Sequence, residues 1–254
     1  MSEVLRLHGL GAVVEVRCTG SAAAELAAAM RTAWSRCRVA PAISPVRAEP
    51  LEVQLEDVAM LPYRLMTTTQ AVTRALIFAR AGGLLMFHAG AVSDPRTGRS
   101  VVFVAKGGTG KTTLSALLGQ RLGYLTDETV GIDESGVICP YPKPLSIRRT
   151  SDVSIKDEVS PDDLGLLATP ERAHVGRVVF LDRQPLVDGV ELEELLILDA
   201  VVGLAEQSSS LPRLTRPLHR IAGLIDRTGP VIRVRYSEAA EAQEVLKDLC
   251  RGPL

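Results

Sequence analysis

The stretch from Val101 to Thr113, VVFVAKGGTGKTT, constrains the fold more than any other part of the chain. It begins with an apolar run typical of a buried strand and ends in residues that favour a helix. Three glycines and two lysines lie between the two. This order predicts an α/β fold in which a buried strand feeds a turn whose backbone N–H groups converge on one point.

The turn follows the pattern G-x-x-x-x-G-K-[ST] of the Walker A or P-loop motif, with Ala105 in place of the first glycine. The remaining glycines permit positive φ angles and a close approach to phosphate, and the helix that follows directs its free N–H groups and dipole at the same anion. Lys111 is expected to reach the β and γ phosphates, and the Thr112 hydroxyl to bind Mg²⁺. The predicted nucleotide-binding residues are Lys106, Gly107, Gly108, Thr109, Gly110, Lys111, Thr112 and Thr113.

A glycine-rich turn with a chance lysine is the alternative, but the position after an apolar strand and before a helix favours nucleotide binding. The motif alone does not separate a kinase from an ATPase or a GTPase.

Length and charge limit the remaining choices. The 254 residues allow one large domain with a small lobe, and we expect a small N-terminal α+β lobe or sheet extension over 1–80 and the main domain over 81–254. A net charge of −1 gives no general attraction to nucleic acid or to anionic membranes. No signal peptide and no apolar run of about 18 residues is evident. Four scattered cysteines favour free thiols and a cytoplasmic location.

Several elements around the loop can be predicted from pattern. Residues 84–92 and 100–105 predict an antiparallel hairpin, which would place His88 across from Ala105 at the mouth of the loop. A second hairpin is predicted over 129–142, a helix over 190–207, and an irregular segment over 148–176.

The carboxylates that could serve the loop leave two alternatives open. A strand over 123–126 is expected to cross over from the loop helix and to lie parallel to strand 101–104, with Asp127 and Glu128 at its end. Asp182 ends another apolar strand and is an equal candidate from spacing alone. His88 could orient such a carboxylate or tune its pKa, although a core histidine is the common alternative.

Three segments in order, FHAGAV, AKGGTGKTT and GYLTDETV, resemble the catalytic domain of HPr kinase/phosphorylase. They also resemble the smaller related kinases, which include peptide kinases of lasso-peptide gene clusters. The resemblance extends loosely over residues 80–240, through PYPKPLSIR and PVIRVRYS. The glycine-rich R-G-x-G signature of the true HPr enzymes is absent, and residues 1–80 do not resemble that family's N-terminal domain.

The resemblance implies a phosphoenolpyruvate carboxykinase-like P-loop kinase fold with a mixed sheet. It implies Asp127 as the general base, Glu128 as a residue that holds Mg²⁺ or the base, and His88 as the residue that positions the pair. Lys111 completes the predicted catalytic set. Enzymes of the family are often oligomers, which is the one ground for expecting a homo-oligomer.

The function predicted is an ATP- and Mg²⁺-dependent transfer of the γ-phosphoryl group to a hydroxyl, chiefly a serine of a peptide or protein. One alternative is a small-molecule kinase that acts on free serine, a sugar or a cyclitol. Another is a nucleotide-sensing module without catalysis.

Overall fold

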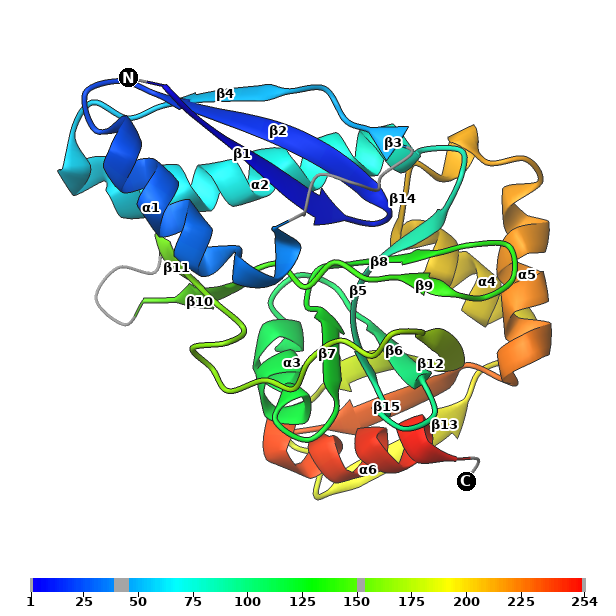
Figure 1. Ribbon diagram of the computed structural model, residues 1–254. Helices are drawn as coiled ribbons and strands as arrows, with labels where there is room; N and C mark the ends of the chain where they lie inside the picture. The colour runs from blue at the N-terminus through cyan, green and yellow to red at the C-terminus, as the bar shows by residue number, and fades with distance from the viewer. Residues whose placement is uncertain (1, 39–45, 150–153, 253–254) are drawn as a thin grey trace. The chain divides into compact units, whose positions relative to one another are not determined.

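The computed structural model describes residues 2–38, 46–149 and 154–252 (Figure 1). The chain divides into two compact units, Met1–Arg80 with Tyr141–Gly165, and Ala81–Pro140 with Leu166–Leu254. The boundary after residue 80 coincides with the sequence-based division. The first unit also takes in the segment Tyr141–Gly165, of which residues 141–149 and 154–165 are described, whereas the sequence-based division left this segment in the domain over 81–254.

The first unit combines a small mixed sheet with two helices. β1 pairs antiparallel with β2, and β3 and β4 pair parallel with β2, while β10 and β11 form a separate antiparallel pair. Its elements are β1 Glu3–Gly9, β2 Ala12–Thr19, α1 Ala23–Ala33, η1 Ser35–Cys37, β3 Val46–Arg47, β4 Leu51–Gln54, η2 Val58–Met60, α2 Leu61–Arg80, β10 Leu145–Arg148 and β11 Lys156–Val159.

Aromatic packing explains why the Tyr141 segment belongs to this unit. The rings of Trp34 and Tyr141 are both fully buried, with centroids 6.1 Å apart. The Tyr141 hydroxyl lies 2.9 Å from the Thr73 hydroxyl, so the one polar atom of the Tyr141 side chain has a hydrogen-bond partner inside the core.

The second unit is built on a nine-stranded mixed sheet with the order β13-β15-β12-β6-β5-β8-β9, and β7 and β14 also pair with β5. β12 lies parallel to both β6 and β15, and the other pairs of this sheet are antiparallel. The strands are β5 Leu85–Ser93, β6 Arg99–Val104, β7 Gly123–Thr126, β8 Thr129–Ile132, β9 Ile138–Cys139, β12 His174–Arg183, β13 Val190–Glu194, β14 Ser208–Ser209 and β15 Ile232–Tyr236. The helices are α3 Lys111–Gly119, α4 Ile197–Glu206, η3 Leu211–Arg213, α5 Pro217–Thr228 and α6 Ala239–Arg251.

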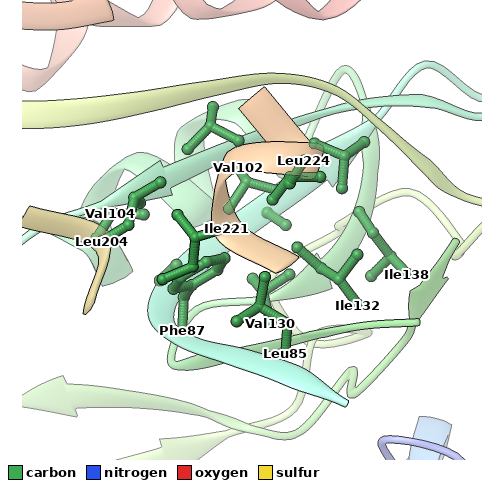
Figure 2. Close-up of a cluster of buried hydrophobic side chains, with 14 of the residues drawn as sticks. Leu85, Phe87, Val102, Val104, Val130, Ile132, Ile138, Leu204, Ile221 and Leu224 are labelled. Atoms are coloured by element: carbon green, nitrogen blue, oxygen red, sulfur yellow. The ribbon is translucent and has the colours of Figure 1, made fainter. Parts of the chain in front are cut away.

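Helices cover both faces of this sheet. Figure 2 shows the core on one face, where Leu204 of α4 and Ile221 and Leu224 of α5 pack over β5, β6 and β8. On the other face, α3 and α6 pack over β6, β12 and β15 through side chains that include Leu114 and Leu246. The central strands are therefore buried on both sides, which explains the continuous apolar run in VVFVA.

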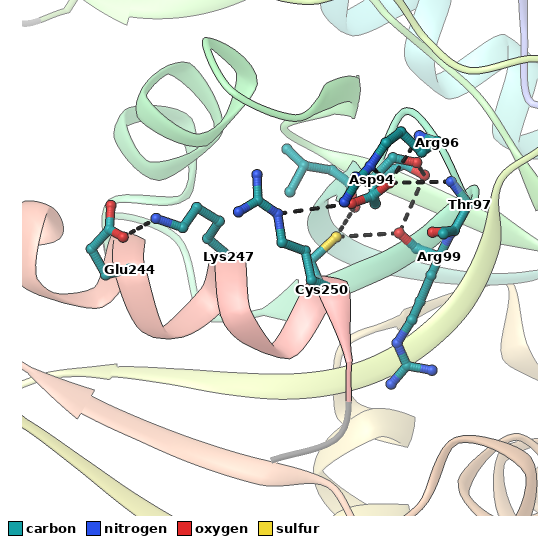
Figure 3. Close-up of polar contacts among 10 residues, drawn as sticks. Asp94, Arg96, Thr97, Arg99, Glu244, Lys247 and Cys250 are labelled. Atoms are coloured by element: carbon teal, nitrogen blue, oxygen red, sulfur yellow. Dashed lines mark hydrogen bonds and ion pairs between the residues drawn. The ribbon is translucent and has the colours of Figure 1, made fainter.

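The hairpin of β5 and β6 has the predicted register. Ala89 pairs with Val104, so His88 and Ala105 are the next residues along the two strands at the loop end. Figure 3 shows the turn at the opposite end, where the Asp94 carboxylate accepts hydrogen bonds from the amides of Arg96 and Thr97 at 2.8 and 3.1 Å. Burial raises the pKa of Asp94, but these hydrogen bonds and the nearby arginines bring it below the usual value.

The C-terminal helix is attached to the same turn. Figure 3 shows the Cys250 thiol directed at the backbone of the hairpin, with Sγ 3.2 Å from the Arg99 carbonyl oxygen. Arg251 lies 3.8 Å from the Asp94 carboxylate. The helix that covers one face of the sheet therefore also stabilises the turn that sets the register of β5 against β6.

The helix predicted over 190–207 is wrong in its first half. Residues 190–194 form the edge strand β13, which pairs antiparallel with β15, and the helix begins at Ile197. Glu193 accepts hydrogen bonds from Arg233 and Arg235 of β15 at 2.8 and 2.5 Å. Pairing with a neighbouring strand outweighs the helical preference of a Leu- and Glu-rich run.

The prediction of irregular structure over 148–176 is also wrong in part. It contains β11, which pairs with β10, and the first residues of β12, while residues 150–153 lie outside the described part of the chain. Charged side chains of this segment form an ion pair between Arg149, directly after β10, and Asp157 of β11, at 2.5 Å.

Candidate functional site

The glycine loop, defined here as residues 105–110, connects the end of β6 to the start of α3. Gly108 and Gly110 have φ angles of 85° and 100°, which L-residues with a side chain rarely adopt. Apart from each glycine and its two chain neighbours, no heavy atom of the described residues lies within 4 Å of where a Cβ would stand on Gly107 or Gly108. The loop is therefore open on its outer side, and the free N–H groups of α3 begin at its end.

Two hydroxyl groups brace the loop. The Thr109 hydroxyl donates to the Lys106 carbonyl oxygen at 2.9 Å, and the Tyr236 hydroxyl donates to the Thr109 carbonyl oxygen at 2.9 Å. Burial raises the pKa of Tyr236 to about 12, so its hydroxyl keeps the proton that it donates. The end of β15 thus holds the loop in shape, a role that no sequence pattern indicated.

Lys111 lies inside the loop and is only 6% exposed. Its ammonium group donates to the carbonyl oxygens of Ala105 and Lys106 at 2.6 and 3.1 Å. Burial lowers the pKa of Lys111 to about 8, and the charges of Asp127 and Glu128 oppose this fall. A buried cation at the base of an open, glycine-lined turn is a strong attractor for an anion.

Asp127 lies next to the first turn of α3. The Thr112 hydroxyl donates to Oδ2 of Asp127 at 2.9 Å, and the Tyr124 hydroxyl lies 3.2 Å from Oδ1. The Asp127 side chain is only 4% exposed. The structure therefore brings Lys111, Thr112 and Asp127 together, as the sequence-based hypothesis required.

The strand that leads to Asp127 runs parallel to β6, as predicted, although the two strands are not neighbours. β7 and β8 both pair antiparallel with β5. Asp127 and Glu128 lie between these two strands, after the pair Ala91–Thr126 and before the pair His88–Thr129. The strand before Asp127 therefore runs in the same direction as β6 but is separated from it by β5. β5, the hairpin partner of β6, occupies the position between them.

Tyr124 is the residue of this site that the sequence did not indicate. It belongs to a four-residue strand and is fully buried, as expected of an ordinary core tyrosine. The register of β7 shifts by one residue between Val92 and Ala91 of its partner. This bulge breaks the alternation of side chains, and the Tyr124 hydroxyl reaches a carboxylate three residues later.

His88 and Glu128 are the other predicted site residues with ionisable side chains near Lys111. Burial lowers the pKa of His88, the Lys111 charge lowers it further, and Glu128 and Asp127 act in the opposite direction. The Glu128 carbonyl oxygen accepts a hydrogen bond from the Ala89 amide at 3.0 Å, which fixes the acidic pair against β5.

Asp182, the competing carboxylate, lies near the end of β12. It pairs with Arg235 at 3.5 Å and accepts hydrogen bonds from Gln184 at 3.2 Å. It also lines a cavity of about 670 Å³ beside the loop. The lining residues of this cavity are Ala105, Lys106, Gly107, Gly108, Thr109, Phe180, Leu181, Asp182, Arg183, Leu195, Asp199, Gly203, Glu206, Gln207 and Arg233.

No family model and no curated protein matches the sequence. Among solved structures, the HPr(Ser) kinase/phosphatase from Coxiella burnetii is similar over 65% of this chain and 88% of its own, with 16% identity and a TM-score of 0.36. A score of this size does not establish a shared fold. Within the described part of the chain, no helix is long and apolar enough to cross a membrane.

Proposed function

We propose that this protein is an ATP- and Mg²⁺-dependent kinase that transfers the γ-phosphoryl group to a hydroxyl, chiefly a serine of a peptide or protein. The observation that carries the proposal is the hydrogen bond from Thr112 to Asp127 beside the open glycine loop. A loop that only binds nucleotide needs a lysine and a hydroxyl. A buried carboxylate at the same point adds a group that can accept a proton.

The loop fits a triphosphate. The outer side of Gly107 and Gly108 is free of neighbouring side chains, so phosphate oxygens can approach the backbone closely. Lys111 supplies the positive charge, and the positive end of α3 adds to it. Because Lys111 already donates to loop carbonyls, its ammonium group has to turn only a short way to meet an anion.

The residues also fit Mg²⁺ that is shared with phosphate. Among the described residues there is no cluster of three or more His, Cys, Asp or Glu side chains that could hold a metal alone. Thr112 and the acidic pair offer only hard oxygen ligands, and Mg²⁺ usually completes such a set with phosphate oxygens and water. We propose Thr112 and Glu128 as the residues that hold the ion.

The chain's own residues then have defined tasks. Asp127 accepts the proton of the acceptor hydroxyl while that oxygen bonds to the γ phosphorus and the bond to the ADP oxygen breaks. Lys111 neutralises the charge on the transferred group. His88 positions the acidic pair, and its lowered pKa favours the neutral ring at pH 7. Bound Mg·ATP supplies the phosphoryl group and the leaving group.

The experiment that tests this function is phosphoryl transfer by the Asp127→Asn variant. We expect transfer to fall by about 10²–10⁴-fold with ATP affinity nearly unchanged, because only the proton acceptor is lost. Asp188→Asn serves as the control, because Asp188 is a loop carboxylate that does not line the cavity beside the glycine loop. If Asp182→Asn abolished transfer while Asp127→Asn kept full activity, the assignment of Asp127 as the general base would be wrong.

The acceptor is identified in the same assay. Labelled ATP is incubated with a protein fraction and, separately, with the small-molecule fraction of a cell extract. Label in protein that survives hydrolysis as phosphoserine supports the proposal. Label in metabolites alone would make the chain a small-molecule kinase, and ATP binding without any transfer would make it a nucleotide sensor.

A further inference from the structure

The outer edge of β13 is a feature of the second unit that the proposed function does not use. β13 is the first strand in the order of the nine-stranded sheet, and β15 is its one strand partner among the described residues (Figure 1). Its sequence, VELEE, contains no proline and no lysine, and no bulge interrupts its register against β15. Proteins commonly use these three devices to keep a second strand away from an edge. The edge of β13 lacks them and can therefore pair with an extended chain.

A hydrogen bond directly beyond β13 shows which of its backbone groups point outward. The Leu195 amide donates to the Val231 carbonyl oxygen at 2.9 Å, in the register position that follows the last pair of the two strands. Hydrogen-bonded and non-hydrogen-bonded pairs alternate in an antiparallel ladder, so Glu193 and Glu191 are the residues that bond to β15. The residues whose N–H and C=O groups face the free edge are Val190, Leu192 and Glu194.

Charged side chains alternate in sign across the sheet and end at this edge in glutamates. Asp182 of β12, Arg235 of β15 and Glu191 of β13 share one row of the register. The Arg235 guanidinium lies 3.5 Å from the first carboxylate and 3.8 Å from the second. In the next row, Glu193 accepts a hydrogen bond from Arg233 at 2.8 Å. Since opposite charges on neighbouring strands attract, the side chain that continues either row beyond β13 should be positive.

The two faces of the edge differ in chemistry. Because side chains alternate along a strand, Glu191 and Glu193 lie on one face, and Val190 and Leu192 lie on the other. Val190 packs against the core under α6, and Leu192 is 44% exposed. The Glu191 side chain is 61% exposed, so a partner on that face can reach it. An added strand would therefore match this edge if its basic and apolar residues alternated.

The other basic side chain at the end of β12 does not neutralise these glutamates. Arg183 donates to the Ser237 carbonyl oxygen at 2.9 Å and lies 3.2 Å from the Glu238 carboxylate. Glu194 is exposed and forms no ion pair with any described residue. The edge therefore keeps a negative charge that a basic partner could neutralise.

We propose that the free edge of β13 binds an extended segment of the peptide or protein acceptor, in which basic and apolar residues alternate, as an added strand of the sheet. The inference rests on the proposed function, because it describes how the acceptor of that kinase is held. Main-chain hydrogen bonds supply affinity, and Glu191 and Glu193 select lysine or arginine at every second position. A second copy of this chain is a poor occupant, because three of the five residues of β13 are glutamates and like charges would lie opposite one another.

The width of the sheet sets the place of the serine in such an acceptor. Val190 pairs with Tyr236, whose hydroxyl braces the glycine loop, so this end of β13 lies at the loop edge of the sheet. Asp127 lies beside β5, and the path from the added strand crosses six strand spacings, or about 29 Å at about 4.8 Å each. An extended chain covers this distance with about nine residues. We therefore expect the acceptor serine at least about nine residues from the alternating segment.

The test measures binding of labelled synthetic peptides to the full chain by fluorescence anisotropy, without nucleotide. One peptide alternates lysine and valine, a second has the same composition with its lysines grouped together, and a third alternates glutamate and valine. Leu192→Pro removes an N–H that faces the free edge and leaves the bonds to β15 in place. Glu191→Lys reverses the charge at the edge. Glu134→Lys is the matched control, because Glu134 is an exposed glutamate that also lies 3.8 Å from one arginine.

We expect the unmodified protein and the control to bind the lysine–valine peptide at least tenfold more tightly than the grouped peptide. Leu192→Pro should lose this preference, and Glu191→Lys should prefer the glutamate–valine peptide. Equal binding of the alternating and grouped peptides, or binding that both β13 variants retain, would overturn the inference. A dimer of the unmodified protein that Leu192→Pro dissociates would also overturn it, because a second copy would then cover the edge.

Phosphoryl transfer separates this inference from the proposed function. The lysine–valine peptide is joined at either end to a serine through a glycine–alanine linker of about three or about twelve residues. At least fivefold faster transfer through the longer linker, lost in Leu192→Pro, would support the inference, and equal transfer through both linkers would count against it. Peptide binding at β13 without transfer from ATP to any acceptor would refute the kinase proposal alone. Transfer to protein acceptors that neither β13 variant slows would refute the binding of acceptors at β13 alone.

Discussion

Replacement of Lys111 by methionine tests whether the lysine of the glycine loop is buried with its charge. Methionine is close to lysine in length and packs in the same space without a charge. Burial lowers the pKa of Lys111 from 10.5 to about 8. At about 1.4 kcal/mol for each pKa unit, this corresponds to a cost of about 3 kcal/mol for keeping the protonated group in the folded chain.

The sign of the pH dependence follows from proton binding. Between pH 8 and pH 10.5 the unfolded chain keeps the proton on Lys111 and the folded chain has lost it, so the unfolding free energy of the unmodified protein rises with pH. The Lys111→Met variant lacks this contribution. Relative to the variant, the unmodified protein should therefore gain about 3 kcal/mol between pH 7 and pH 10.5.

The assay is urea unfolding followed by far-ultraviolet circular dichroism at several pH values, without nucleotide. The difference between the two proteins is the quantity of interest, because burial raises the pKa of Cys37, Cys250 and Tyr236 and these groups make the same contribution to the pH dependence of both proteins. Trp34, the single tryptophan, lies in the first unit and reports separately on unfolding there. A stability difference that stays constant from pH 7 to pH 10.5 would refute a lowered pKa for Lys111.

Four further predictions concern the second unit. Tyr124→Phe should lower phosphoryl transfer about tenfold with the KM for ATP unchanged, because one hydrogen bond to the Asp127 carboxylate is lost; a change in KM alone would contradict a positioning role. Gly90→Ala should cost about 1–3 kcal/mol of unfolding free energy, since its Cβ would lie 2.2 Å from the Phe103 ring. Gly107→Ala should leave the unfolding free energy unchanged, because its Cβ would meet no neighbour within 4 Å, but it should weaken ATP binding. Equal losses of unfolding free energy in Gly90→Ala and Gly107→Ala would refute this packing argument. Binding of ATP at pH 9 should take up close to one proton, because phosphate raises the lowered pKa of the loop lysine; calorimetry in two buffers of different ionisation enthalpy measures it, and no uptake would contradict it.

Features carried by neighbouring residues could be predicted from the sequence. The strand, the glycine turn and the helix after it are contiguous, and positive φ angles at Gly108 and Gly110 are a local requirement that only glycine meets readily. The register of the β5–β6 hairpin follows from the short turn that joins its strands. For the same reason, the position of His88 opposite the loop was predictable.

Features that depend on strand pairing could not be predicted in this way. Residues 190–194 have a composition that suits a helix, and only the exposed edge of β15 makes them a strand. The bulge that brings Tyr124 to Asp127 depends on how β7 fits against β5, and nothing in the four residues of β7 encodes that fit.

The sequence by itself determined the composition of the loop, since the glycines, Lys111 and Thr112 follow one another along the chain. Tertiary structure alone decided which carboxylate meets that loop, and that the Tyr236 hydroxyl braces it from the last strand. It also decided how far the Lys111 charge is removed from water, and that a cavity opens between β12 and α4. The physical reason is that hydrogen-bond distance, burial and cavity shape depend on residues far apart along the chain, such as Thr109 and Tyr236, which are 127 positions apart, and local pattern carries no information about such pairs.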